Sequence, residues 1–186
     1  MGTTMIVVLA AVGLFILLVV GIFNRLVTLK VRTGEAWSQI DVQLKLRTDL
    51  VPNLVETVKG YAAHEKSTLE NVIKARNMAQ EAGTTDPAKA AAADNMLTGA
   101  LKSLFAVTEN YPELKANANF VMLQTELSGI EAKIAYARQF YNQCVMAYNQ
   151  YQSTMPAVFF SSAFGHKHGV FFEAEEADKK TPAVKF

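Results

Sequence analysis

Hydrophobic residues form one unbroken run near the start of the chain and recur at helical spacing after it. Residues 5–23, MIVVLAAVGLFILLVVGIF, contain no charged side chain, and Arg25 is the first charged residue of the sequence. A run of about 20 apolar residues can cross the hydrocarbon core of a bilayer as one helix. The pattern therefore predicts a transmembrane helix over residues 5–23, preceded by a short extramembrane end at residues 1–4.

A cleaved signal peptide is the alternative interpretation of this run. Signal peptides carry basic residues before the apolar part and small residues at the cleavage site. This chain begins with MGTT, and its apolar run ends in Ile22, Phe23 and Asn24. These features favour an uncleaved anchor.

The charges beside the apolar run predict how it is oriented. Arg25, Lys30 and Arg32 follow the run, and no basic side chain precedes it. Because cytoplasmic flanks carry the excess of Lys and Arg, we expect the N-terminus outside the cell and the remaining chain in the cytoplasm.

Three long helices are predicted after the anchor, each from an apolar stripe with spacings of three and four residues. The first stripe contains Trp37, Ile40, Leu44, Val51, Leu54, Val58, Tyr61, Leu69, Val72, Ala75 and Ala79. The second helix is expected from Pro87, with Asp86 as its N-cap, to about Asn110. The third begins at Pro112, ends before Met155-Pro156, and has the most regular stripe of the chain.

No segment alternates apolar and polar residues with the period of a strand, so the predicted fold is all-α. We expect the transmembrane helix to continue into an elongated antiparallel bundle of three long helices plus a short C-terminal segment, which together occupy residues 24–173. The charged end, residues 174–186, is expected to be disordered because it lacks the apolar residues of a core.

Two residues of the first stripe raise specific structural questions. Pro52 lies inside it, yet the stripe keeps its phase across the proline, which predicts a kinked but continuous helix. Arg47 falls on the buried stripe itself. Either it pairs in the core with Glu126 or Glu131, or its stem lies along the core while its head reaches solvent.

Composition and motifs argue against several classes of protein. With 18 Lys and Arg against 17 Asp and Glu, the chain lacks the basic excess of a nucleic-acid binder. The position four residues after His64 is Thr68, so the zinc motif HExxH is missing, and no phosphate loop or nucleophile elbow occurs. We therefore expect no enzymatic activity, no cofactor and no metal.

The aromatic residues near the C-terminus are candidates for interaction. The triplet YNQ occurs at residues 141–143 and again at 148–150, a spacing that places both copies on one helix face. It is either a ladder for a partner helix or a core seam with solvated amides, and the seam is favoured. The candidate interaction or structural residues are Trp37, Arg47, Pro52, Tyr141, Tyr148, Tyr151, Phe159, Phe160, Phe164, Phe171 and Phe172.

Three segments of the sequence resemble the LemA family of bacterial membrane proteins. They are AWSQIDVQLKLRTDLVPNLVETVKGYAAHE (residues 36–65), ENYPELKANANFVMLQTELSGIEAKIAYARQFYN (residues 109–142) and the ending MP…F…FGH…VFFE. The resemblance implies a single-pass protein of the bacterial inner membrane with a helical-bundle body. One branch of the family is associated with magnetosome membranes, and the resemblance supplies no catalytic residues.

The leading functional hypothesis is a membrane-anchored scaffold that forms homo-oligomers through its amphipathic helices and its aromatic tail. Its expected partners are the lipid bilayer and further copies of itself. The alternative is a tethered adaptor that presents the bundle to another protein, such as an envelope-stress component or a protease.

Overall fold

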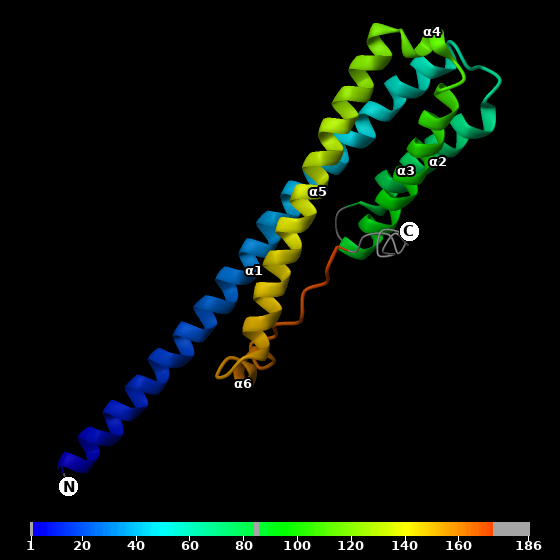
Figure 1. Ribbon diagram of the computed structural model, residues 1–186. Coiled ribbons are helices and arrows are strands. Elements are labelled where there is room, and N and C mark those ends of the chain that lie inside the picture. Colours follow the sequence, from blue (N-terminus) through cyan, green and yellow to red (C-terminus); the bar gives the residue numbers. More distant parts are fainter. Residues whose placement is uncertain (1, 84–85, 173–186) are drawn as a thin grey trace, which may run out of the picture. The chain divides into compact units, whose positions relative to one another are not determined.

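The computed structural model describes residues 2–83 and 86–172, and these residues fold almost entirely into helices (Figure 1). No strand occurs in the described ranges, so the predicted all-α class is confirmed. The predicted disorder of residues 174–186 concerns a segment outside them. The helices are α1 (Gly2–Lys59), α2 (Lys66–Ala82), α3 (Pro87–Thr108), α4 (Pro112–Lys115), α5 (Ala118–Ser153) and α6 (Val158–Ser161).

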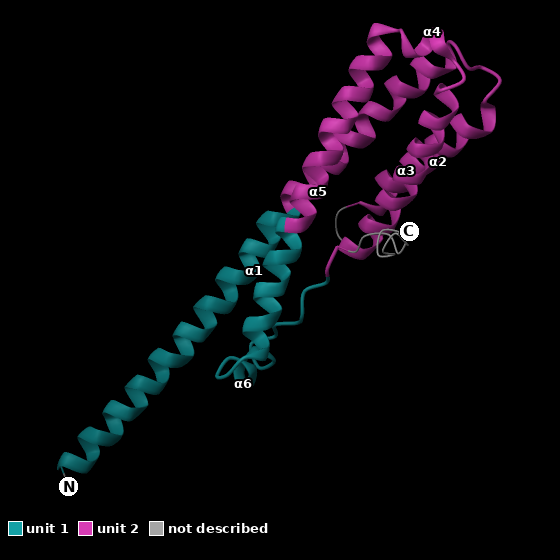
Figure 2. Ribbon diagram, viewed as in Figure 1, with its two compact units in different colours: residues 1–37, 140–170 teal, residues 38–139, 171–186 magenta. Residues whose placement is uncertain are grey.

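The described residues divide into two compact units, coloured separately in Figure 2. Unit 1 contains residues 2–37 and 140–170, and unit 2 contains the described residues of 38–139 together with 171–172. The helices α1 and α5 each contribute to both units.

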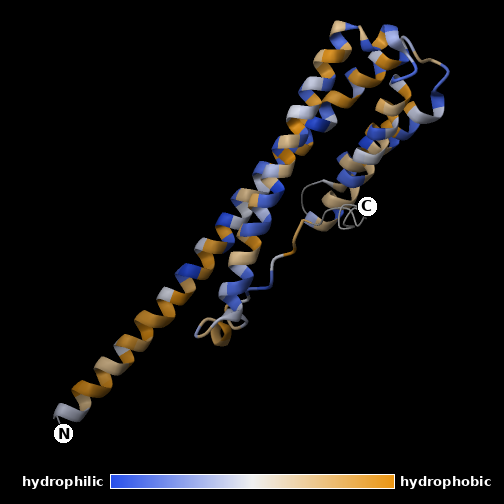
Figure 3. Cartoon of the chain, in the orientation of Figure 1, coloured by the Kyte–Doolittle hydropathy of each residue, from blue (hydrophilic) through white to orange (hydrophobic). Residues whose placement is uncertain are grey.

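The first helix, α1, contains both the apolar run and the first part of the predicted bundle. It passes through Pro52 without a break, which confirms the predicted continuity; the kink stays a prediction. Its N-terminal part is predominantly apolar (Figure 3), and this is the one described helix long and apolar enough to cross a membrane. Most apolar residues of this part are exposed, as expected of a surface that faces lipid, and they indicate a membrane location.

The phase of the first stripe predicted a single helix as far as Ala79, but the structure breaks this stretch into two helices. The helix α1 ends at Lys59, and a turn follows in which the amides of Tyr61 and Ala62 both donate to the Val58 carbonyl, at 3.0 and 2.8 Å. Glycine at position 60 weakens helix propagation by about 1 kcal/mol relative to alanine. Tyr61, which the stripe contains, is 42% exposed, and its neighbour Ala62 is buried instead, so the apolar pattern continues although the helix does not.

The core of unit 2 is built by α1, α2, α3, α4 and α5. The helices α2 and α3 pack against each other, and Asp86 caps α3 by accepting bonds from the amides of Ala88 and Lys89, with Pro87 in the first turn as predicted. The buried residues of this core are Val51, Leu54, Val55, Val58, Ala62, Leu69, Val72, Ala75, Leu97, Leu101, Leu104, Leu114, Phe120, Leu123 and Leu127.

The third predicted helix begins at Pro112 but is interrupted after one turn. The short helix α4 ends at Lys115, and α5 starts at Ala118. The side chain of Asn117 accepts bonds from the amides of Asn119 and Phe120, at 2.9 and 3.1 Å, and so caps the new helix. The predicted end before Met155-Pro156 is confirmed.

In unit 1, the C-terminal part of α5 packs against α1, and the following loop turns back onto both. Its core combines Ile22, Leu26 and Leu29 of α1 with Tyr148 of α5 and with Ala157 just before α6. The residues after α6 then follow α5 in irregular conformation as far as Val170.

Candidate functional site

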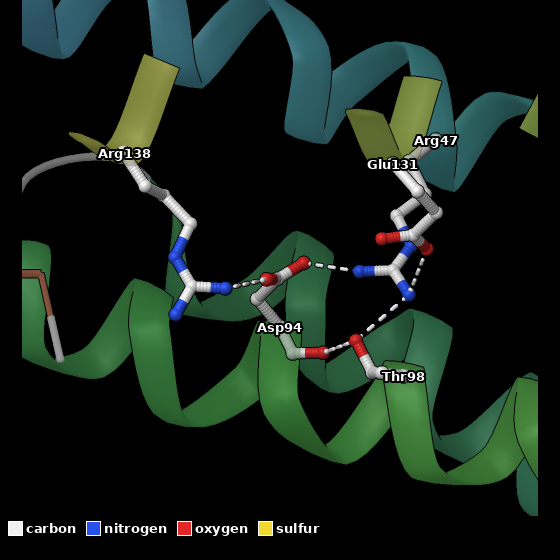
Figure 4. Close-up of polar contacts among 5 residues, drawn as sticks. All are labelled: Arg47, Asp94, Thr98, Glu131 and Arg138. Carbon is white, nitrogen blue, oxygen red and sulfur yellow. Dashed lines mark hydrogen bonds and ion pairs between the residues drawn. The ribbon is translucent and has the colours of Figure 1, made fainter. Parts of the chain in front are cut away.

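The most prominent polar feature of unit 2 is a buried charge cluster that joins three helices (Figure 4). Arg47 of α1 is 1% exposed and donates to Asp94 of α3 at 2.5 Å and to Glu131 of α5 at 2.5 Å. It also donates to the Thr98 hydroxyl at 2.9 Å, and Arg138 of α5 approaches the second oxygen of Asp94 to 4.0 Å. Two cations and two carboxylates therefore balance one another inside the bundle.

This arrangement decides between the two expectations for Arg47. Its head is buried and paired rather than solvated, and Glu131 is one of the two partners proposed from the sequence. The main partner, Asp94, was missed, because an aspartate in the Ala-rich segment AKAAAADNML could equally have been an exposed helix residue. The signal was its register: Asp94 lies three residues before Leu97, on the buried face of α3.

The cluster perturbs the acidity of Glu131. Burial raises the pKa of its carboxyl, and the charge of Asp94 adds to this effect, while the neighbouring Arg47 opposes it. The cluster thus holds an arginine whose charge is compensated on two sides. Its chemistry is that of a structural junction between α1, α3 and α5.

Pro52 affects the bonding of the helix one turn earlier. A proline has no amide hydrogen, so the carbonyl of Thr48, four residues before it, loses its helical donor. Arg76 of α2 fills this place: its Nε donates to the Thr48 carbonyl at 3.3 Å. The proline in α1 is therefore coupled to the docking of α2, a link that the sequence pattern did not reveal.

In unit 1, the tyrosines and amides of the YNQ repeat hold the chain's own C-terminal segment. The Tyr141 hydroxyl donates to the Val170 carbonyl at 2.8 Å. The side chain of Asn149 donates to the Gly169 carbonyl at 2.9 Å and accepts from the Gly169 amide at 2.7 Å. The buried tyrosines agree with the favoured core seam, but the amide of Asn149 is used inside the chain rather than solvated.

Tyr148 of the same face bonds to a histidine in this segment. Its hydroxyl lies 2.8 Å from Nδ1 of His166. Burial lowers the pKa of the His166 imidazole, and the positive charge of Lys30 on α1 lowers it further. The neutral imidazole therefore suits this position, as an acceptor for the tyrosine hydroxyl.

The phenylalanines near the C-terminus have different environments. The ring of Phe160 lies 6.3 Å from Phe15, and that of Phe164 lies 5.2 Å from Phe23, so both pack on the apolar part of α1. Phe159 is 68% exposed. Of these three phenylalanines, Phe160 and Phe164 therefore dock on α1, and Phe159 does not.

The remaining candidate residues also lie in defined positions. In unit 1, Trp37 packs against Tyr141 with ring centroids 5.3 Å apart, and Tyr151 is half-buried beside the core. In unit 2, Phe172 is buried under the guanidinium of Arg138, which lies 4.8 Å above its ring, while Phe171 is exposed.

The helix α5 carries a second stripe that no described residue covers. This stripe consists of exposed positions three and four residues apart, the same spacings as in the buried seam of α5. The positions are Met122, Thr125, Gly129, Ala132 and Tyr136. Tyr136 is 71% exposed and borders a shallow groove of about 650 Å³ that Val42 of α1 lines from the other side. Positions with this spacing share one face of the helix, which is the geometry that helix pairing requires.

Groups for metal binding are not assembled in the described part of the chain. No three His, Cys, Asp or Glu side chains there come together in a way that could hold a metal. Cys144 is free and buried. A pocket of about 270 Å³ beside Arg47 is lined by residues of α1, α2 and α3, and it is smaller than usual ligand sites of roughly 300–1,000 Å³.

Comparison with known proteins agrees with this structure. The sequence profile described as the LemA family matches residues 36–186. The chain belongs to the LemA family. This membership indicates a membrane-associated protein. The names of the related proteins do not refer to a chemical reaction.

The similar proteins include three with magnetosome names, two of them from one organism. A magnetosome protein MamQ of Paramagnetospirillum magneticum is 26% identical over 97% of this chain and 75% of its own length. The magnetosome protein MamQ of Magnetospirillum gryphiswaldense is 25% identical over 87% of this chain and 68% of its own. Protein LemA of Metamycoplasma hominis is 26% identical over 74% of this chain and 63% of its own.

Proposed function

We propose that this protein is a membrane-anchored scaffold whose copies associate through the exposed stripe of α5. The observation that carries the proposal is the stripe itself, from Met122 to Tyr136, with its helix-pairing spacing and its exposure. Small residues at positions 129 and 132 would let a second helix approach closely. The partner is a second copy of the same stripe, because anchoring in one membrane raises the effective concentration of copies and makes weak contacts sufficient.

The anchor would place this scaffold in the inner membrane of a bacterium. The basic residues Arg25, Lys30 and Arg32 after the apolar run favour an outside N-terminus and a cytoplasmic body. The related magnetosome proteins are named for an organelle rather than for a reaction, which supports a structural role over catalysis.

The test is the mass of the full-length protein in mild detergent, measured by light scattering. We expect a multimer, and we expect Tyr136→Asp to shift it toward the monomer, because a charge at the centre of a helix contact is poorly tolerated. Met96→Asp is the matched control: Met96 is an exposed apolar residue (49%) on α3, away from the stripe. Circular dichroism would show that both variants keep their helices.

Two outcomes would overturn the proposal. A multimer that Tyr136→Asp leaves intact would place the contact on another surface. If the wild-type protein is a monomer in detergent and an Ala132→Cys variant forms no crosslink between copies in vesicles, self-assembly is excluded. The tethered adaptor is then favoured, and the next experiment is capture of its partner.

A further inference from the structure

The loop between α5 and the C-terminal segment is apolar, uncharged and attached to the membrane helix. Residues 139–166 contain no Asp, Glu, Lys or Arg, and the loop itself, residues 154–165, reads TMPAVFFSSAFG. Three of its large apolar side chains are exposed to solvent: Met155 at 79%, Val158 at 40% and Phe159 at 68%. Such a surface needs an occupant, and its position relative to α1 indicates which one.

The loop lies beside the part of α1 that is expected inside the bilayer. Phe164 contacts Phe23, the last residue of the apolar run, and Phe160 contacts Phe15, eight residues deeper. Eight residues of helix correspond to about 12 Å along the axis. If α1 spans the membrane, the loop therefore extends from its edge into one leaflet.

The backbone of the loop is suited to such an environment. Lipid offers no hydrogen bonds, so a segment within it must satisfy its amides internally. In this loop, many amides donate to carbonyls of the loop or of the end of α5 that precedes it. The residues whose amides do so are Thr154, Val158, Phe159, Phe160, Ser161, Phe164, Gly165 and His166. The hydroxyl of Thr154 also donates inward, to the Tyr151 carbonyl.

Two lysines lie at the level at which the chain leaves the loop. Lys167 follows the loop after His166, and Lys30 of α1 is close enough for its charge to act on His166. Exposed Lys side chains at this level match the position of lipid headgroups. We propose that residues 154–165 form a second membrane contact, in which Met155, Val158 and Phe159 insert into the leaflet beside α1.

Tryptophan quenching in vesicles tests this contact directly. The chain has one tryptophan, Trp37, which Trp37→Phe removes while keeping a ring against Tyr141. In that background, Phe159→Trp reports on the loop, Leu17→Trp on the bilayer beside α1, and Met96→Trp on an exposed site of α3. Each protein is reconstituted in phosphatidylcholine vesicles that contain lipids brominated along their acyl chains, and acrylamide serves as the aqueous quencher.

We expect the Phe159→Trp probe to behave like the Leu17→Trp probe: several-fold stronger quenching by brominated lipid than at the Met96→Trp site, and weaker quenching by acrylamide. Acrylamide quenching equal to that of the Met96→Trp probe would overturn the proposal, since the loop would then lie in water. Protection from both quenchers would also overturn it, because a second copy or another protein would cover the loop. Repeating the measurement with Tyr136→Asp separates this result from self-assembly through α5.

Discussion

Replacing Arg47 by methionine is the sharpest test of the buried charge cluster. Methionine keeps most of the volume of the arginine stem but removes the guanidinium. The change leaves Asp94, whose side chain is 4% exposed, without its direct partner, and it removes the bonds to Thr98 and Glu131. The stability of unit 2 should therefore fall, because a buried carboxylate has lost its compensating charge.

The expected loss is set mainly by Asp94. Breaking a buried ion pair by removing one member costs about 3–5 kcal/mol. Arg138, 4.0 Å from the second oxygen of Asp94, partly compensates the remaining charge, so the lower end of the range applies. Glu131 is 39% exposed, and its share is that of a surface pair, about 0–1 kcal/mol. A loss of about 3 kcal/mol corresponds to a melting temperature lower by roughly 6–12 °C.

The assay is thermal unfolding in detergent, followed by circular dichroism, with two companion variants. Lys45→Met removes an exposed cation from the same helix, and it should change stability by less than about 0.5 kcal/mol. The double variant Arg47→Met with Asp94→Leu replaces the pair by apolar side chains, which is often neutral or stabilising. We expect it to recover most of the stability lost in the single variant.

Two results would refute this reasoning. If Arg47→Met lowers the melting temperature no more than Lys45→Met does, the buried ion pair does not contribute to stability. If the double variant is as unstable as the single one, the loss comes from packing around position 47 rather than from the charge of Asp94.

Three further predictions concern single contacts. Arg76→Met should lower stability by about 1 kcal/mol, and by less in a Pro52→Ala background that restores an amide to the Thr48 carbonyl; equal losses in both backgrounds would contradict the coupling. Asn149→Leu should speed hydrogen exchange of the Gly169 amide, whereas Gln150→Leu, at an exposed position, should not. The pKa of His166, measured by NMR, should lie below 6.5 in the folded protein. The neutral imidazole then contributes fully to stability above pH 6.5, and this contribution is lost as the pH falls through the folded pKa. A pKa at or above 6.5 would contradict the burial of the ring.

The helices themselves could be predicted because their signals are local. The apolar run, the cap at Asp86, the proline at position 87 and the stop at Met155-Pro156 are each readable from a few neighbouring residues. The break after Lys59 could not be read from the stripe, because the buried Ala62 keeps the apolar phase through the turn. Periodicity reports which side chains are buried, and a tight turn can bury them as well as a helix does.

The candidate sites were less predictable because their partners are distant in the sequence. The position of Arg47 on a buried stripe left open whether its head was paired or solvated, and its main partner, Asp94, lies on α3, 47 residues further on. Likewise, Pro52 was interpreted from the sequence only as a kink, while the packing of α2 brings Arg76 to the carbonyl that the proline leaves without its helical donor. A sequence shows which group lacks a partner; the tertiary fold determines which residue supplies it.

A second lipid contact in unit 1 would change what the anchor can do. A single membrane helix leaves a protein free to tilt relative to the bilayer, so neighbouring copies meet at many different tilts. The loop at residues 154–165 is attached to one side of α1, through Phe160 and Phe164, and its insertion would restrict the tilt of unit 1. Copies held at a similar tilt lose less orientational freedom when they associate, so the same weak contact gives a more stable assembly. The proposed lipid contact would therefore favour assembly without providing any of the contact surface between copies.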